Sequence, residues 1–139
     1  TSVSRGLGDV YKRQVIDNGS FLYCSDTYSD DLPYWIKKGN KKQLMVPYTL
    51  DNNDMRFATN QGFNSGEQFY NYLKDSFDAL YEEGKTSPKM MSVGLHCRLI
   101  GRPGRIQSLK KFLNYITKFK DIWICKRVDI AKHWIKNYS

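Results

Sequence analysis

A histidine at the end of an apolar run is the residue of this chain best suited to chemistry. Residues 90–95 are mostly apolar and His96 follows at once; the next nine residues hold Arg98, Arg102 and Arg105 among two glycines and a proline. The unperturbed pKa of histidine lies nearest neutrality, which suits it to proton transfer. At the carboxyl end of a strand in a parallel α/β protein, His96 would lie where catalytic groups collect. The alternative is a histidine that caps the strand and hydrogen-bonds a neighbour.

Two polar segments could act with this histidine. Residues 24–35 hold Asp26, Asp30 and Asp31 close together, and Pro33 interrupts any regular element there. Clustered carboxylates can bind a metal or tune a base, but aspartates also cap local turns. The second segment, Asp51 to Asp54, directly follows an apolar run and could present hydrogen-bonding groups to a ligand or form an ordinary capping loop.

Strands and helices must position these residues. Ser65 and Gln68 have capping-box spacing and Gly84 is a stop signal, so a helix is predicted between them. Apolar periodicity predicts further helices over 106–119 and 128–137, the end of another near Asn18, and strands over 20–23, 44–49, 90–95 and 121–125. An exposed turn is expected over 36–42, with its tip at Gly39 and Asn40. Strands alternating with helices in this way imply right-handed parallel crossovers, and therefore an α/β fold.

Composition and charge restrict the class of protein. The 139 residues are 40% hydrophobic and 14% aromatic, which indicates a folded chain, and no apolar run reaches the roughly 18 residues that span a bilayer. Three widely spaced cysteines suggest no disulfide framework and a reducing, cytoplasmic compartment. The net charge of +8 is uneven, because residues 86–139 carry twelve Lys and Arg against two acids. Such a basic half is typical of nucleic-acid binding or of solvated helix faces, and the lysine positions favour the second.

The first fourteen residues differ from the rest. Residues 4–14 (SRGLGDVYKRQ) closely resemble a translated sequencing-adapter sequence, so we expect residues 1–14 to be non-native and disordered, and the native chain to continue upstream. The domain proper is then predicted to begin at Val15 and to run to the end, residues 15–139.

Five blocks of the remaining sequence resemble one family. They are GSFLYCSDTYSDDLPYW (19–35), MVPYTLDNNDMRF (45–57), GFNSGEQFYNYLKDSFDALYEEG (62–84), GLHCRLIGRPGR (94–105) and KRVDIAKHW (126–134). Together they resemble the C-terminal part of the polysaccharide deacetylase (NodB-like) superfamily, within which the likeness is greatest to cofactor-independent bacterial allantoinases.

The resemblance implies an α/β fold, the C-terminal part of a distorted (β/α) barrel. It implies that His96 is the general acid and that Asp26 and Asp31 support and orient it. The base, the metal-binding histidines and an arginine-proline motif of the family would lie upstream, so the chain alone is expected to be inactive. The allantoinase branch implies no cofactor and no metal. It also implies a small, allantoin-like substrate, no nucleic-acid or membrane partner, and a homo-oligomeric full-length protein.

Three functions follow as hypotheses. The first is an allantoinase fragment in which Arg98, Arg102 or Arg105 holds carbonyl oxygens, and Asp51, Asn53 or Asp54 binds ureido nitrogens; each arginine is alternatively a surface residue. The second is a metal-dependent N-deacetylase of chitin or peptidoglycan, with exposed aromatics stacking on sugars. The third is a non-enzymatic, basic nucleic-acid-binding module, which would need exposed aromatics among the lysines.

Overall fold

The chain divides into two compact units, which are described separately. The computed structural model describes the backbone of residues 7–139 and the side chains of residues 12–139. The terminal unit comprises Thr1–Tyr48 and Ile124–Ser139, and the central unit comprises Thr49–Trp123. His96 and the Asp51–Asp54 segment lie in the central unit, whereas Asp26 and Asp31 lie in the terminal unit.

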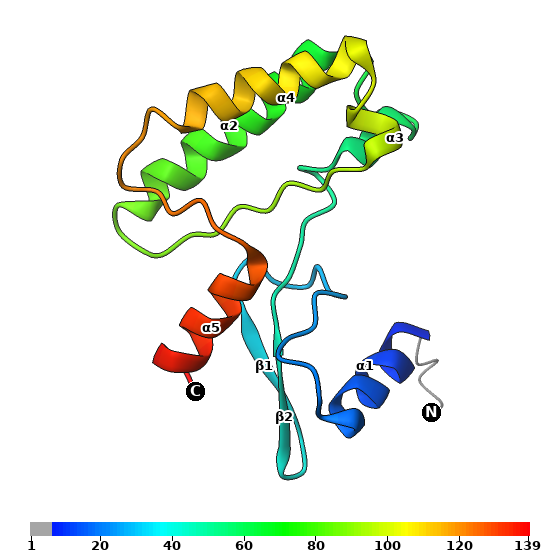
Figure 1. The fold of residues 1–139 in the computed structure, drawn as a ribbon, viewed down its shortest axis with the longest axis vertical. Helices are drawn as coiled ribbons and strands as arrows, with labels where there is room; N and C mark the ends of the chain where they lie inside the picture. The colour runs from blue at the N-terminus through cyan, green and yellow to red at the C-terminus, as the bar shows by residue number, and fades with distance from the viewer. Residues whose placement is uncertain (1–6) are drawn as a thin grey trace. The chain divides into compact units, whose positions relative to one another are not determined.

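The terminal unit is built on a hairpin. Strands β1 (Tyr34–Lys38) and β2 (Lys41–Met45) pair antiparallel, with Tyr34 opposite Met45. The turn expected at Gly39 is confirmed, and Gly39 adopts a φ of +56°, which glycine tolerates best. Helix α5 (Arg127–Asn137) covers the hairpin, so that Leu44, Val46 and Ala131 form a small core with flanking tryptophans. Figure 1 shows β1, β2 and α5 in cyan and red.

Helix α1 (Leu7–Asn18) also belongs to this unit. It ends at Asn18 as predicted, and Gly19 follows with a φ of +69°. Its start differs from the expectation, because the helix extends into the adapter-like segment that we expected to be disordered. Lys12, Arg13 and Gln14 are good helix formers, so a helix at Val15 propagates upstream easily. Residues 1–6 lie outside the described residues.

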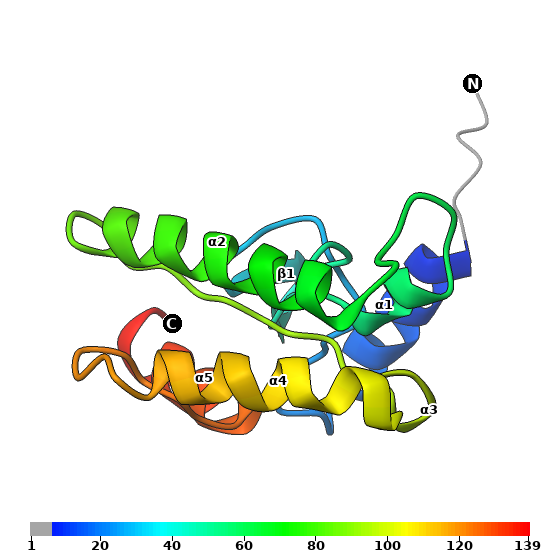
Figure 2. The same ribbon diagram turned by 90° about the horizontal axis from the view of Figure 1, so that it is seen from above.

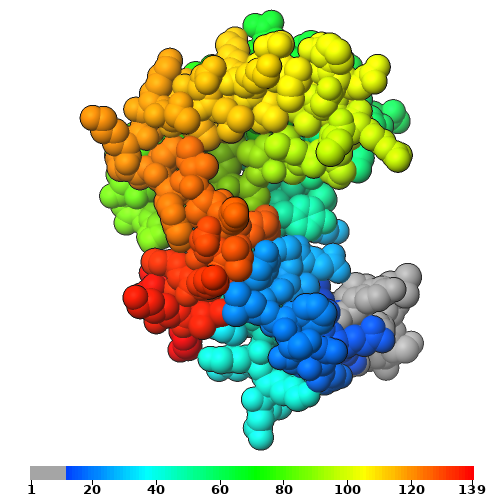
Figure 3. Space-filling model, viewed as in Figure 1, coloured from blue at the N-terminus to red at the C-terminus, as the bar shows by residue number. Residues whose placement is uncertain are grey.

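The central unit is a pair of helices and the segments that cross beneath them. It holds the 3-10 helix η1 (Asp54–Phe57) and helices α2 (Gly66–Gly84), α3 (Cys97–Ile100) and α4 (Pro103–Ile116). Helices α2 and α4 lie side by side and run in the same direction (Figures 1 and 2). Their facing stripes bury a largely aromatic core: Phe63, Phe69, Tyr70, Leu73, Phe77, Ile100, Phe112 and Ile116. Figure 3 shows the outer side of α4, yellow to orange, as a continuous surface.

Helix boundaries follow the sequence signals closely. The Ser65 side chain accepts a hydrogen bond from the Gln68 backbone (3.2 Å), and α2 ends at Gly84, as predicted. Helix α4 begins three residues before the predicted position because Pro103 occupies its first turn, where the missing N–H costs nothing. The one-turn helix α3 was not predicted.

The parallel strands are shorter than predicted. Segments 20–23, 90–95 and 121–125 form no regular strand among the described residues, and Leu22 and Asp121 lie in bends. Parallel pairing survives as two single bridges, one between Cys24 and Met45 and one between Asn53 and Gly94. A ladder needs several successive pairs. Among the described residues, segment 90–95 makes one bridge, at Gly94, the other bridge lies at Cys24, just after 20–23, and 121–125 makes none. The predicted direction of pairing is therefore present, while the predicted strand lengths are wrong.

Candidate active site

A buried carboxylate holds His96. The Asp54 side chain is completely buried, and its Oδ1 lies 2.6 Å from Nδ1 of His96. The His96 side chain is 47% exposed, so the ring is anchored on one nitrogen and open to solvent elsewhere. An imidazole whose Nδ1 is fixed in this way keeps Nε2 as the nitrogen for proton exchange. This is the arrangement that a positioned general acid or base requires.

Asp54 also fixes the backbone around the histidine. Its Oδ2 accepts hydrogen bonds from the backbone N–H of His96 (2.7 Å) and of Ile100 (3.0 Å). His96 is the N-cap residue of α3, with φ −123° and ψ 127°, and its own side chain caps nothing. The carboxylate therefore serves as the cap of α3, a position where negative charge is favourable. One residue sets both the ring and the helix that follows it.

The parallel bridge brings Asp54 to His96. Gly94 donates its N–H to Asn52 O (2.8 Å) and accepts from Asp54 N (3.0 Å). Asn53 lies opposite Gly94, and a Cβ at residue 94 would stand 2.2 Å from Nδ2 of Asn53. Glycine is thus required for this close approach. The two chain segments end together, which places the carboxylate 42 residues upstream of the histidine within hydrogen-bond distance.

A second buried polar group lies beside this pair. Asn53 is extended (φ −137°, ψ 129°), so Asn52 and Asp54 project from the same side of the segment. Asn52 is 4% exposed, and its Oδ1 has no hydrogen-bond partner among the described residues. An unpaired buried acceptor costs about 1–3 kcal/mol, so such groups are rare unless they serve a purpose.

The residues predicted to bind substrate take different positions. Asp51 is exposed and accepts a hydrogen bond from Tyr72 Oη (3.3 Å). Asn53 is buried and caps η1, because its Oδ1 accepts from Met55 N (2.9 Å). Asp54 differs most from the expectation, since its buried carboxylate is occupied by His96 and Ile100 and presents no free face to a ligand.

The three arginines near His96 also differ from one another. The Arg105 guanidinium stacks over the Phe57 ring at 4.5 Å and donates to Leu99 O. Arg98 and Arg102 are exposed, and their side chains form no hydrogen bond or ion pair within residues 12–139. Of the three, Arg98 and Arg102 are thus free to contact a substrate, whereas Arg105 is engaged with the chain.

The acidic cluster is an exposed turn. Asp30 accepts from the backbone N–H of Asp31 (2.7 Å), which is the turn-forming role left open by the sequence. Asp26 and Asp31 are exposed, and neither carboxylate has a hydrogen-bond or ion-pair partner in the part of the chain that the structure describes. They belong to the other unit, so the support predicted for His96 from them stays a prediction, while Asp54 supplies support within the central unit.

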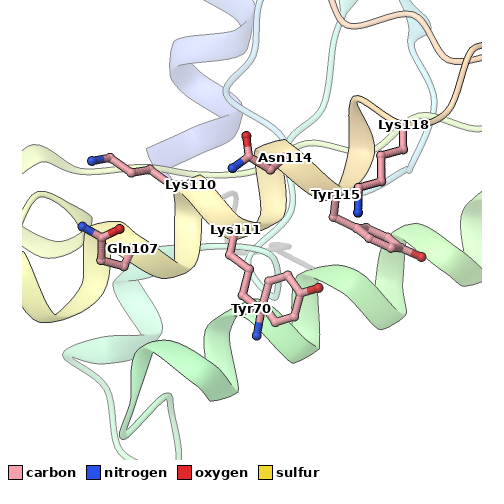
Figure 4. Close-up of a pocket in the computed structure, with 7 residues that line it drawn as sticks. All are labelled: Tyr70, Gln107, Lys110, Lys111, Asn114, Tyr115 and Lys118. Atoms are coloured by element: carbon pink, nitrogen blue, oxygen red, sulfur yellow. The ribbon is translucent and has the colours of Figure 1, made fainter.

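A shallow hollow of about 450 Å³ lies elsewhere on the central unit. It is lined by residues of α4 and by Tyr70 of α2, and three lysines (Lys110, Lys111 and Lys118) surround it (Figure 4). None of the predicted site residues lines it. Lys111 stacks on the Tyr70 ring at 4.1 Å. We interpret the hollow as part of the solvated polar face of α4.

Outside the candidate site, charged and polar side chains stabilise the pairing of α2 with α4. Burial opposes ionisation of Asp78, but hydrogen bonds from Lys74 and Tyr115 outweigh it and hold the pKa of this carboxyl below its ordinary value. Tyr115 Oη donates to Asp78 at 2.7 Å, which joins α4 to α2. In the terminal unit, burial lowers the pKa of the Arg127 guanidinium, which donates to the carbonyls of Val46 and Pro47.

No group of three or more His, Cys, Asp or Glu side chains that could hold a metal ion occurs among the described residues. Within the same residues, no helix has the length and apolar character needed to cross a bilayer.

Comparisons with known proteins agree on one family. No protein-family model matches the chain. A putative polysaccharide deacetylase of Schizosaccharomyces pombe is 48% identical over 122 aligned positions, covering 81% of this chain and 38% of that protein. Among solved structures, a probable polysaccharide deacetylase of Pseudomonas aeruginosa PAO1 is 56% identical with a TM-score of 0.88, covering 92% of this chain and 43% of that one. The chain belongs, over part of the length of its members, to the polysaccharide deacetylase family.

Within the family, an allantoinase is equally similar. The PuuE allantoinase structure is 50% identical with a TM-score of 0.89, and the match covers 99% of this chain and 45% of that one. A more distant polysaccharide deacetylase fold, from Mycobacterium smegmatis, matches at 22% identity and a TM-score of 0.75. These likenesses confirm the predicted family and fold class. The chain spans less than half the length of each of these relatives.

Proposed function

We propose that this chain carries the proton-donating part of an amide-hydrolysing site, most similar in kind to an allantoinase. The observation that carries the proposal is the anchored pair, in which a fully buried Asp54 lies 2.6 Å from Nδ1 of a half-exposed His96. The family membership supports hydrolysis of a C–N bond, and the 50% identity to PuuE allantoinase supports a cyclic amide such as allantoin as substrate.

His96 would act on the leaving nitrogen. Water adds to the carbonyl carbon, and the C–N bond then breaks as Nε2 of the protonated ring gives its proton to the departing nitrogen. Nδ1 stays bonded to Asp54 throughout, so the ring keeps its orientation during the transfer. Arg98 and Arg102 are the free cations nearest in sequence, and we propose that they contact the substrate's carbonyl oxygens.

The second candidate is N-deacetylation of a polysaccharide. The name of the S. pombe relative and that of the P. aeruginosa structure favour it, at identities as high as those of the allantoinase. The same histidine would protonate the amino group of the sugar. The two candidates therefore share the role of His96 and differ in the substrate and in the need for a metal, whose ligands we expect upstream of this chain.

The test uses the longer protein that carries these residues. We expect consumption of allantoin, and a decrease in kcat of about 100-fold or more in the variant His96→Gln, the usual size of a lost acid–base group. Lys111→Gln, at the Tyr70 ring and outside the candidate site, is the matched control and should keep the rate. Release of acetate from a chitin oligomer without allantoin turnover would favour the second candidate, and an unchanged kcat in His96→Gln would contradict both.

A further inference from the structure

Arg105 makes two contacts that connect the elements on either side of the anchored pair. Its guanidinium carbon lies 4.5 Å from the centre of the Phe57 ring, in η1. Its Nη1 donates to the carbonyl of Leu99, in α3, at 3.3 Å. The Arg105 side chain is partly buried, and it projects from the first turn of α4.

These two elements are the ones that carry the candidate site. Asp54 is the first residue of η1, three residues before Phe57, and His96 immediately precedes α3. Ile100, whose N–H donates to the Asp54 carboxylate, follows Leu99 directly. If η1 moved away from α3, the distance from Asp54 to the His96 ring would increase. The distances from Asp54 to the backbone N–H groups of His96 and Ile100 would increase with it. Arg105 opposes that movement because it contacts both η1 and α3 without contacting Asp54 or His96.

We propose that Arg105 is a positioning residue that clamps η1 to α3 and so holds the Asp54–His96 pair in register. The proposal deepens the proposed function, on which it rests for its catalytic meaning, and it gives Arg105 a role different from that of a substrate ligand. Arg105 touches neither reacting group, and it acts through Phe57 and Leu99.

The geometry explains why an arginine suits this position. A guanidinium is planar, so its face can stack on a ring while an N–H at its edge donates to a carbonyl. A lysine ammonium is a compact point charge and would make one of these contacts at a time. A cation–π contact strengthens as the ring and the cation lose water, so at a partly buried side chain it favours one arrangement of a short helix. Arg98 and Arg102 make neither kind of contact within residues 12–139.

The experiment measures the His96 ring directly. In this chain with ¹⁵N-labelled histidine, the ring shifts report which nitrogen carries the proton in the neutral form. We expect the parent chain to hold His96 as the Nδ1–H tautomer because of Asp54, with exposed His133 as the internal reference. Arg105→Gln should shift His96 toward a mixture of tautomers, and Arg105→Lys should give a smaller shift.

The matched control is Lys111→Gln, which removes another cation from an aromatic ring in the same unit. It should lower the thermal midpoint no more than Arg105→Gln does, because Lys111 is exposed and makes a ring contact without the added hydrogen bond of Arg105, and it should leave His96 unchanged. An unchanged His96 tautomer in Arg105→Gln overturns the clamp. An equal change in Lys111→Gln also overturns it, since general loosening would then explain the effect. If Arg105→Gln does not fold, the same comparison is made with Arg105→Lys.

A second measurement separates the clamp from the proposed reaction. In the longer protein, loss of positioning should lower kcat by about 10-fold with KM nearly unchanged, whereas loss of a substrate contact would raise KM. A raised KM with an unchanged tautomer overturns the positioning role. If the longer protein hydrolyses no amide but the tautomer shifts as expected, the clamp stands and the proposed function fails.

Discussion

At the scale of the residue, the site depends on how one carboxylate is satisfied. Asp54 is buried, and burial of a carboxylate is costly unless donors surround it. Here the Nδ1 of His96 and two backbone N–H groups supply them. Asn52, two residues earlier on the same side of the segment, has no such partner for its Oδ1. Burial of the Asp54 carboxylate is therefore compensated by hydrogen bonds, whereas burial of the Asn52 Oδ1 is not.

One substitution made at both sites tests this contrast. Asp54→Leu leaves the buried Ile100 N–H and the part-buried His96 N–H without their acceptor and should lower the free energy of unfolding by about 2–4 kcal/mol. Asn52→Leu removes an acceptor that is already unpaired, so the free energy of unfolding should stay the same or increase by about 1 kcal/mol. Urea unfolding of both variants measures the difference. Equal destabilisation would show that the Asn52 amide is satisfied in solution.

At the scale of the element, the sequence predicted the features that depend on a few neighbouring residues, such as helix ends and tight turns. The cap at Ser65, the stop at Gly84 and the glycine turn at Gly39 are local, and all three are confirmed. His96 was predicted at the carboxyl end of a strand over 90–95; in the described residues that strand is reduced to one bridge at Gly94, two residues before His96. The partnership of Asp54 with His96 was not predicted, because it depends on which two segments pair across 42 residues. Both residues follow apolar runs, however, and the ends of parallel strands share one edge, so this signal was available.

The role of Arg105 and the pairing of residues 90–95 could not be predicted from the sequence, because both depend on tertiary contacts. Arg105 could be read as a ligand-binding arginine or as a brace, and only the packing of Phe57 beneath it distinguishes the two. The strand at 90–95 was predicted from apolar content, which reports burial but not the number of pairing partners. Its pairing is one bridge at Gly94, and this bridge carries the site.

The bridge can be tested with a methyl group. Gly94→Ala would place a Cβ 2.2 Å from Nδ2 of Asn53, so Asn53 must move and its hydrogen bond to Met55 N is lost. We expect the free energy of unfolding to fall by about 1–3 kcal/mol. Gly84→Ala is the control, because nothing lies within 4 Å of a Cβ there and a gain of about 0.4–1 kcal/mol is expected. Thermal unfolding of both variants gives the comparison, and a Gly94→Ala chain as stable as Gly84→Ala would contradict the close approach.

At the scale of the whole molecule, the proposed function assigns to this chain one of the roles that amide hydrolysis needs. An activated water, a site for the oxyanion and an acid for the departing nitrogen are all required. In the proposed function, the anchored His96 would supply the acid. Its carboxylate neighbour is buried and fully engaged, so Asp54 is not available to activate water. The relatives are more than twice as long as the part that this chain matches, which leaves room in them for the other two functions.

We therefore expect the 139-residue chain by itself to give no allantoin turnover above the buffer rate, although it keeps the His96–Asp54 contact. The longer protein should turn over allantoin, and its His96→Gln variant should fall toward the rate of the chain alone. A colorimetric assay of allantoate at equal molar concentrations makes the comparison. Histidine ring shifts of the isolated chain show whether the anchored pair is intact in the inactive sample. Turnover by the chain alone at a rate abolished by His96→Gln would mean that these residues contain a complete site, with a base that we have not assigned.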